Sequence, residues 1–320
     1  VDNLPCDIFK AGGTPCVAAH STVRALYKSF NSSLYSVRRQ KDNKSLDIGV
    51  KTVGGFADSN AQDLFCQGDI CVFDRIYDQS HNKNHLGIAP PGGAHREQDI
   101  PAIANAGPLT IGGHKVYGLR MDPPSGYRND TTTGIAVGDE AETIYAVVNG
   151  SHYNDQCCFD YGNAETDNLD DGAGTMEALY FGNAKGGIFH GGAGRGPWIM
   201  ADMENALWGA DVVKSNERPI NHDFVTVMIK GDVSTNAPGG HWAIKGGDAN
   251  QGKLEVYWDG KRAPRYAPMK KQGAIILGIG GDNSDGAVGT FYEGCMTRGY
   301  TSDAADDAVQ ANIVAAGYGR

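Results

Sequence analysis

The sequence predicts an all-β protein built as an antiparallel sandwich or barrel. Three observations predict it: the 320 residues include 45 glycines, the apolar runs are short, and strands do not alternate with helical segments. Gly, Asn and Asp separate the runs, as is typical of turns between antiparallel strands. Without βα alternation a parallel sheet is not expected. No repeat or linker divides the chain, so we expect one domain over residues 1–320.

Two short helices are expected, one near each end of the chain. Residues 14–30 place four apolar side chains at roughly helical spacing. Residues 302–319 repeat apolar side chains every four residues, with Ser302 as a candidate N-cap and acidic residues in the first turn. The clearest predicted strands between them are 143–150, 176–182, 223–231, 253–260 and 273–281.

Charge and motifs argue against several classes of function. The net charge is −10 and the 28 Lys and Arg residues form no block, so neither nucleic acid nor an anionic membrane is an expected partner. The longest apolar run, 273–281, is too short to span a bilayer. Glycine clusters at 191–198 and 278–286 lack the Gly-Lys-Ser/Thr ending of a phosphate loop, and a turn is the preferred interpretation.

Cysteines and glycosylation sequons favour a secreted protein. There are seven cysteines and no spaced Cys-x-x-Cys pair, so we expect disulfides and no zinc site. The start VDNLPCD has no basic and apolar leader, as expected of a processed mature chain. Four sequons are present, at Asn31, Asn43, Asn129 and Asn149.

Two adjacent cysteines, Cys157 and Cys158, open the stretch CCFDYGNAET. Neighbouring Cα atoms across a trans peptide are about 3.8 Å apart, below the usual range of about 4.4–6.8 Å for a disulfide. A bridge between them would therefore close a strained ring. A shared metal site and two separate long-range bridges are the alternatives that the residues leave open.

Acidic residues mark two candidate sites. If residues 197–208 form a strand, Asp202 and Glu204 project from one face, which is costly unless that face opens into a polar cleft. The flanking Trp198 and Trp208 could offer stacking surfaces for a sugar. The alternative is an ordinary exposed sheet face.

The second acidic candidate is Asp282, which follows an apolar run and two glycines in IILGIGGDN. The glycines allow the backbone to approach a ligand while the acid stands at the end of a strand. Two carboxyl groups facing each other across a cleft are the minimum apparatus for glycoside hydrolysis. A turn aspartate is the alternative, and spacing alone does not decide between them.

Six stretches together resemble the catalytic domain of the alpha-L-arabinofuranosidase B family, glycoside hydrolase family 54. The likeness covers nearly the whole chain, from about Cys6 to Ala316. It implies a concanavalin-like β-sandwich of the jelly-roll kind with short peripheral helices, a retaining hydrolase, and no metal or organic cofactor. The stretches are CDIFKAGGTPCVAAHST, YDQSHNKNHL, APPGG, HYNDQCCFDYGNAET, GPWIMADMEN and QGAIILGIGGDN.

The resemblance also implies residue roles. Glu204 matches the family's nucleophile in the Asp-Met-Glu-Asn block, and Asp282 matches its general acid/base in the Gly-Gly-Asp-Asn block. Asp202, Asn205 and Gly281 match positions that hold the hydroxyls of the terminal arabinose. The substrates implied are terminal arabinofuranosyl groups on the side chains of hemicellulose or pectin, such as arabinoxylan and arabinan.

The cysteines match the family's disulfide pattern. Cys157 and Cys158 fall where the family carries a vicinal disulfide that lines the sugar pocket, so a rigid apolar wall is implied. The remaining implied bridges are Cys6–Cys16 and Cys66–Cys71, which leaves Cys295 as a free buried thiol.

The chain departs from the family pattern at three places. Phe189 stands where the family has a sugar-contacting tryptophan, and Ala206 stands where a second sugar-binding asparagine is common. The chain ends at Arg320, so the C-terminal arabinose-binding β-trefoil domain of the family is expected to be absent.

Two alternative functions stay open: a lectin-like sandwich without activity, and a related β-xylosidase or galactofuranosidase. We expect an extracellular monomer.

Overall fold

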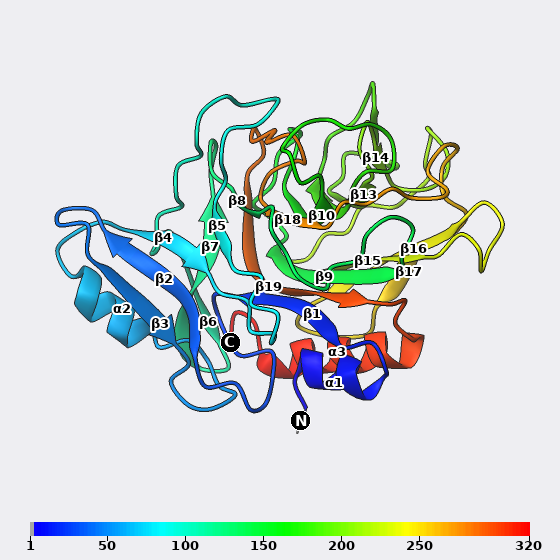
Figure 1. Cartoon of the computed structure of the whole chain (residues 1–320). Coiled ribbons are helices and arrows are strands. Elements are labelled where there is room, and N and C mark those ends of the chain that lie inside the picture. Colours follow the sequence, from blue (N-terminus) through cyan, green and yellow to red (C-terminus); the bar gives the residue numbers. More distant parts are fainter. Residues whose placement is uncertain (1–2) are drawn as a thin grey trace.

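Two β-sheets stack face to face as a sandwich in the computed structural model, which describes residues 3–320 (Figure 1). The eight-stranded sheet has the order β17-β16-β15-β9-β19-β7-β6, and β1 pairs with β19 beside this path. Every pair in it is antiparallel. Its strands are β1 (Cys16–Ser21), β6 (Gly107–Ile111), β7 (His114–Met121), β9 (Glu142–Asn149), β15 (Phe224–Asp232), β16 (His241–Asp248), β17 (Glu255–Gly260) and β19 (Gly289–Arg298).

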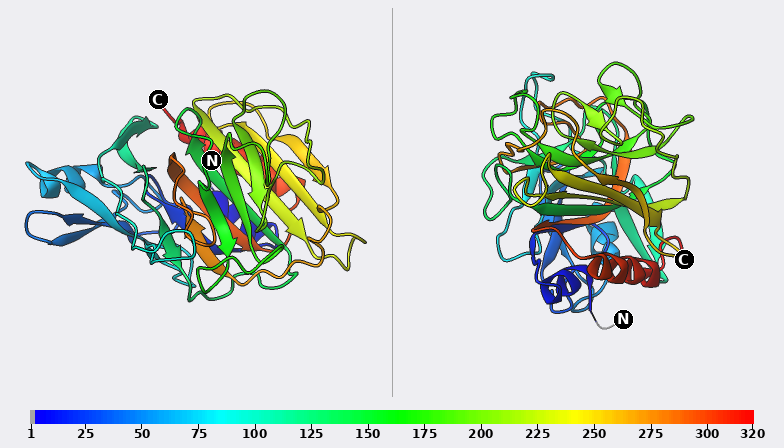
Figure 2. Two further views of the ribbon diagram at one scale, coloured as in Figure 1. Left: turned by 90° about the horizontal axis from the view of Figure 1, so that it is seen from above. Right: turned by 90° about the vertical axis from the view of Figure 1, so that its right-hand side faces the viewer.

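The second sheet has eleven strands in the order β12-β14-β13-β11-β10-β18-β8-β5-β4-β2-β3. All of its pairs are antiparallel except the short parallel pair β12 and β14. Its far end, β4, β2 and β3, projects sideways with α2 (Figure 2). The strands are β2 (Ser33–Arg39), β3 (Ser45–Gly49), β4 (Cys71–Ile76), β5 (Leu86–Ile88), β8 (Tyr127–Asn129), β10 (Asp160–Ala164), β11 (Glu177–Gly182), β12 (Phe189–His190), β13 (Trp198–Asp202), β14 (Leu207–Trp208) and β18 (Ala274–Leu277).

The helix expected near the C-terminus is confirmed as α3 (Asp303–Ala316). Ser302 caps it by accepting the Ala305 N–H at 3.2 Å, and Gly317 ends it with a left-handed φ of 77°. Helix α3 lies beneath the eight-stranded sheet (Figure 1). It is held there because Lys230 of β15 and Lys245 of β16 both reach one carboxylate, Asp306, at 2.7 Å.

The helix expected over residues 14–30 is wrong. Residues 16–21 form strand β1 instead, and their hydrogen bonds go to β19. The real N-terminal helix is α1 (Pro5–Ala11), with proline in its first turn, and a further helix, α2 (Ser59–Cys66), was not anticipated. The apolar spacing of residues 14–30 reflects burial between neighbouring elements, which a sequence pattern cannot separate from helical periodicity.

The five predicted strands are present as β9, β11, β15, β17 and β18, with small differences at their ends. The largest difference is at β18, which ends at Leu277 because Gly278 turns the chain with a φ of 81°. No helix in residues 3–320 is long and apolar enough to cross a membrane.

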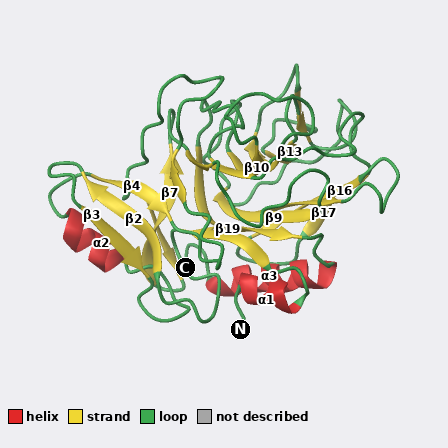
Figure 3. Cartoon of the chain, viewed as in Figure 1, coloured by secondary structure: helices red, strands yellow, loops and turns green. Residues whose placement is uncertain are grey.

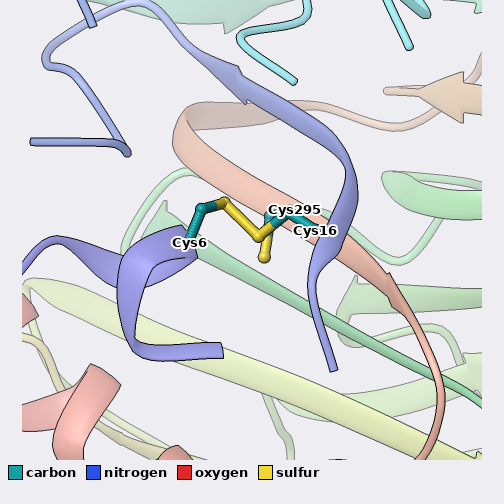
Figure 4. Close-up of side chains that lie close together, drawn as sticks. All are labelled: Cys6, Cys16 and Cys295. Carbon is teal, nitrogen blue, oxygen red and sulfur yellow. A yellow bond between two sulfur atoms is a disulfide. The ribbon is translucent and has the colours of Figure 1, made fainter. Parts of the chain in front are cut away.

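The structure contains the three disulfides that the resemblance implied. Cys6–Cys16 joins α1 to β1, and Cys66–Cys71 joins the end of α2 to β4. Cys295 of β19 is buried and free, and lies beside the first of these bridges (Figure 4). The third bridge, Cys157–Cys158, lies in a loop of the larger sheet.

Strand β13 separates the core of the sandwich from the other face of its sheet. Ile199 and Ala201 belong to the main core between the sheets, whereas Trp198 and Met200 join a separate cluster. Since side chains alternate along a strand, Asp202 shares the face of Trp198 and Met200. Long loops cover this face (Figure 3), and a site can therefore form between them and the sheet.

Candidate active site

One pocket of about 210 Å³ brings together seven of the eight predicted substrate-site residues. The eighth, Cys158, is buried directly behind it, with its Sγ 3.4 Å from Oδ2 of Asp202. The segments that meet here lie far apart in the chain, so tertiary folding assembles the pocket. Its lining is Cys157, Asp170, Ile188, Phe189, Asp202, Glu204, Asn205, Ala206, Leu207, Gly281, Asp282 and Ser284.

Glu204 reaches the pocket through a turn. Residues 197–208 do not form one continuous strand: β13 ends at Asp202 and β14 begins at Leu207. Glu204 and Asn205 follow with left-handed φ angles of 67° and 64°. The N–H of Glu204 donates to Oδ1 of Asp202 at 3.0 Å, and the hydroxyl of Tyr266 donates to the Glu204 carbonyl at 2.8 Å. These two bonds hold a backbone conformation that non-glycine residues rarely adopt.

Asp282 sits in the turn after β18. Its Oδ1 accepts the N–H of Ser284 at 3.1 Å, and its carbonyl accepts the N–H of Ala94 at 2.9 Å. The next residue, Asn283, is fully buried and donates to Asp99 at 3.0 Å. A bond within the turn and two bonds to the loop of residues 94–99 therefore hold the turn that carries Asp282.

Part of the pocket lining is apolar. Cys157 lines it, the Cys157–Cys158 peptide is cis with its Cα atoms 2.9 Å apart, and Phe189 lies nearby with Ile188 and Leu207. The tryptophans proposed as stacking surfaces do not contribute, since Trp198 is only 1% exposed and Trp208 only 7%. Both indoles are packing residues, and the apolar surface comes from the cystine and Phe189 instead.

Asn205 is engaged beside the pocket. Its amide nitrogen donates to Oδ2 of Asp170 at 2.8 Å, and its oxygen accepts the N–H of Ala173 at 3.1 Å. Asp170 was not anticipated from the sequence, because it lies in an acidic, turn-rich loop whose pattern is typical of solvated surface.

Buried carboxyl groups dominate the electrostatics of the site. Burial raises the pKa of Asp202 to about 7, and burial followed by the neighbouring Glu165 carboxyl raises the pKa of Glu204 to about 12. Asp160, buried beside Asp202, has a pKa well above the ordinary range for the same reason. The site of the free protein therefore retains protons at neutral pH.

Asp160 and Glu165 were missed by sequence reasoning. Both are fully buried, Asp160 on β10 and Glu165 directly after it, in the stretch CCFDYGNAET that also contains the adjacent cysteines. Because side chains alternate along a strand, Asp160 and Gly162 of DYGNAET lie on the same face. An acid next to a glycine on one face of a buried strand was the signal that could have pointed to Asp160.

Three groups of potential metal ligands occur within residues 3–320. Two of them depend on cysteines that are bridged, and whose sulfurs are therefore not thiolates. The third consists of His95, Asp99 and Asp285, where Nδ1 of His95 lies 2.7 Å from Asp285 and 3.4 Å from Asp99. His95 thus contacts both carboxylates directly.

Comparisons with known proteins agree with the predicted resemblance. The family model described as "Alpha-L-arabinofuranosidase B, catalytic" matches residues 5–319. Alpha-L-arabinofuranosidase B of Aspergillus niger and that of Aspergillus kawachii are each 54% identical over 322 residues, which cover 98% of this chain and 63% of theirs. The chain thus spans less than two-thirds of the length of these relatives.

Solved structures give the same result. A GH54 arabinofuranosidase soaked with a cyclic sulfate inhibitor has a TM-score of 0.93 at 52% identity, over 98% of this chain and 66% of that one. An arabinofuranosidase complexed with arabinofuranosyl-alpha-1,2-xylobiose also has a TM-score of 0.93 at 52% identity, over 98% and 65%. The predicted β-sandwich is confirmed, and the chain belongs to the alpha-L-arabinofuranosidase B catalytic family, glycoside hydrolase family 54.

Proposed function

We propose that the protein is a retaining, exo-acting alpha-L-arabinofuranosidase that releases terminal L-arabinofuranose from arabinoxylan or arabinan side chains. The observation that carries the proposal is that Glu204 and Asp282, from two turns distant in the chain, line one pocket together with the apolar groups Cys157 and Phe189. The printed names of the relatives, and the arabinofuranosyl-xylobiose held by one similar structure, support the same substrate class.

The reaction proceeds by double displacement. Glu204 attacks the anomeric carbon while Asp282 donates a proton to the departing oxygen, which gives a glycosyl ester on Glu204. Asp282 then takes a proton from water, and this water attacks the same carbon and frees Glu204. Two inversions restore the starting configuration, so the first product is the alpha anomer.

The surroundings suit this chemistry. Positive charge develops on the sugar ring in both transition states, and the acidic pocket favours it. Asp202 and Asn205 would form hydrogen bonds with the hydroxyls of the sugar ring, while the cystine and Phe189 would contact the apolar side of the ring. Ala206 offers no hydrogen bond, so one sugar contact common in the family is lost here.

We further propose that the protein is a secreted, N-glycosylated monomer that acts on arabinose-containing hemicellulose or pectin. Asn31 and Asn43 are exposed and are the best glycan acceptors. The amides of Asn129 and Asn149 donate to His85 and Tyr292, at 2.9 and 3.1 Å, and would have to give up these bonds. A mass shift on endoglycosidase treatment of protein from a eukaryotic secretory host, mapped to the Asn31 and Asn43 peptides, tests this assignment.

The activity is tested by comparing nitrophenyl alpha-L-arabinofuranoside with the beta-xyloside and the galactofuranoside. We expect the arabinofuranoside to be hydrolysed with the highest kcat/KM and NMR to show alpha-arabinose first. Preferred hydrolysis of another glycoside would replace the substrate assignment. Saturable binding of arabinose without turnover would support a lectin-like protein instead.

A further inference from the structure

Glu165 and Glu204 direct their carboxyl groups toward the same small space. A Cβ atom added to Gly281 would lie 2.1 Å from Oε2 of Glu165 and 3.0 Å from Oε2 of Glu204. Only the missing side chain of Gly281 leaves room for both oxygens. Glu165 follows β10 and Glu204 follows β13, so the two acids approach each other from different strands.

Only one of the two oxygens of the Glu165 carboxyl accepts a hydrogen bond from a neighbouring residue. The hydroxyl of Thr175 donates to its Oε1 at 2.6 Å, whereas its Oε2 is buried with no such donor. Arg128 does not pair with this carboxyl either, since its guanidinium donates to the backbone carbonyls of Glu165 and Gly281, the latter at 2.6 Å. Oε2 is left facing Glu204, and a buried polar atom needs a partner.

The charges around the pair are mostly negative. Arg128 of β8 is a cation whose charge acts on Glu165, and the acids that face the pair or share its pocket are Asp160, Asp170, Asp202 and Asp282. Burial raises the pKa of Glu165 as well as that of Glu204, so the pair retains one proton at neutral pH. A nucleophile in this setting needs a neighbour that can hold this proton.

We propose that Glu165 is a positioning residue that takes the proton from Glu204 before attack and then hydrogen-bonds to the carboxylate it has created. The O–H bond on Oε2 of Glu204 breaks and an O–H bond on Oε2 of Glu165 forms, with no change in net charge. When water later cleaves the glycosyl ester, Glu204 leaves as a carboxylate and the proton is still on Glu165. The inference rests on the proposed function, because it requires Glu204 to be the nucleophile.

The test compares Glu165→Gln with Glu165→Ala. Glutamine keeps both hydrogen bonds, because its oxygen can accept from Thr175 and its amide can donate to ionised Glu204. We expect Glu165→Gln to keep kcat/KM within about five-fold of wild type, with the acid limb of its pH profile in place. In Glu165→Ala the carboxylate loses a donor, so kcat/KM should fall by roughly ten- to a hundred-fold and the acid limb should move up by about one pH unit.

A purely structural role would give a different result. It would lower kcat/KM without moving the acid limb, and that outcome with the alanine variant overturns the inference. So does a glutamine variant that loses as much activity as alanine while melting at the wild-type temperature. If Glu165→Ala does not fold, Thr175→Val, which frees the Glu165 carboxyl but leaves it present, should shift the acid limb in the same direction by a smaller amount, and an unmoved limb overturns the inference.

A second readout separates this inference from the proposed function. The infrared spectrum at pH 7 should contain a protonated-carboxyl band that decreases by one group in Glu165→Gln, whatever substrate the protein hydrolyses. Loss of the band with no arabinofuranoside hydrolysis by wild type would refute the proposed activity alone. Normal hydrolysis with an unchanged band would refute the proton transfer alone.

Discussion

The backbone N–H of Glu204 donates to Oδ1 of Asp202 at 3.0 Å and closes the turn that follows β13. Because Glu204 has a left-handed φ of 67°, this bond holds the residue in a costly conformation. Asp202 also has Oδ2 against the sulfur of Cys158 at 3.4 Å. One side chain thus connects the turn that carries Glu204 to the cystine wall, and both should respond when it is replaced.

The role of Glu204 predicts chemical rescue. Glu204→Gly should lower kcat/KM by roughly a thousand-fold or more, because no group remains to form the glycosyl ester. Azide can occupy the vacated space and attack the same carbon, so added azide should restore release of nitrophenol from the arabinofuranoside. Ser284→Ala, which alters the same pocket without removing a carboxyl, should not respond to azide. Near-normal hydrolysis by Glu204→Gly would show that another residue is the nucleophile.

Asp282 is expected to matter most for substrates with poor leaving groups. In Asp282→Asn the proton donor is lost, and natural arabinosides should lose roughly a hundred- to ten-thousand-fold in kcat/KM. With an activated aryl arabinofuranoside, the rate of the first step should be close to that of wild type. The glycosyl-enzyme should then accumulate, because its hydrolysis lacks a base, and a burst of nitrophenol should be observed. Equal losses for both kinds of substrate would contradict an acid/base role.

The buried acids predict that the protein becomes less stable as the pH rises. Burial raises the pKa of Asp202 to about 7 from an ordinary value near 3.8. Between these two values the unfolded chain has released a proton that the folded chain keeps, so the free energy of unfolding falls as the pH rises from about 4 to about 7. For one such group the slope is at most about 1.4 kcal/mol per pH unit.

Urea unfolding with intact disulfides at several pH values between 4 and 8 measures this slope. Asp202→Asn should reduce it, since asparagine keeps an acceptor for the Glu204 N–H but cannot ionise. Asp307→Asn, on the exposed side of α3, is the matched control and should leave the slope as in wild type. An unchanged slope in Asp202→Asn would mean that Asp202 titrates normally.

The cysteines give a prediction that needs no substrate. Peptide mapping without reduction should place Cys157 and Cys158 in one peptide that is lighter by two hydrogens, as the structure pairs them. Cys295 is fully buried and burial raises its pKa well above the ordinary range, so it should react with iodoacetamide only after denaturation. A bridge from Cys157 to a distant cysteine, or fast alkylation of Cys295 in the native protein, would contradict this arrangement.

Local chemistry along the chain was enough to predict much of the fold. Glycine-separated apolar runs predicted β9, β11 and β15 within a residue or two, and Ser302 with its acidic first turn predicted α3. These elements depend on neighbours in sequence, through side-chain alternation or capping. The catalytic roles of Glu204 and Asp282 were predicted from the resemblance to the family. The local pattern could not assign them, because an acid that follows a short apolar run is also common in ordinary turns.

By itself, the sequence determined the approximate positions of the main strands, where the last helix begins, and which residues belong to the family's motifs. Tertiary structure alone decided that residues 16–21 pair with β19 instead of forming a helix, and that Trp198 and Trp208 are core residues. It also decided that Glu165 faces Glu204 across the gap at Gly281. The physical reason is the same in each case: hydrogen-bond partners, burial and proton affinity are set by segments that are distant in the chain, and they have no signature in the local pattern.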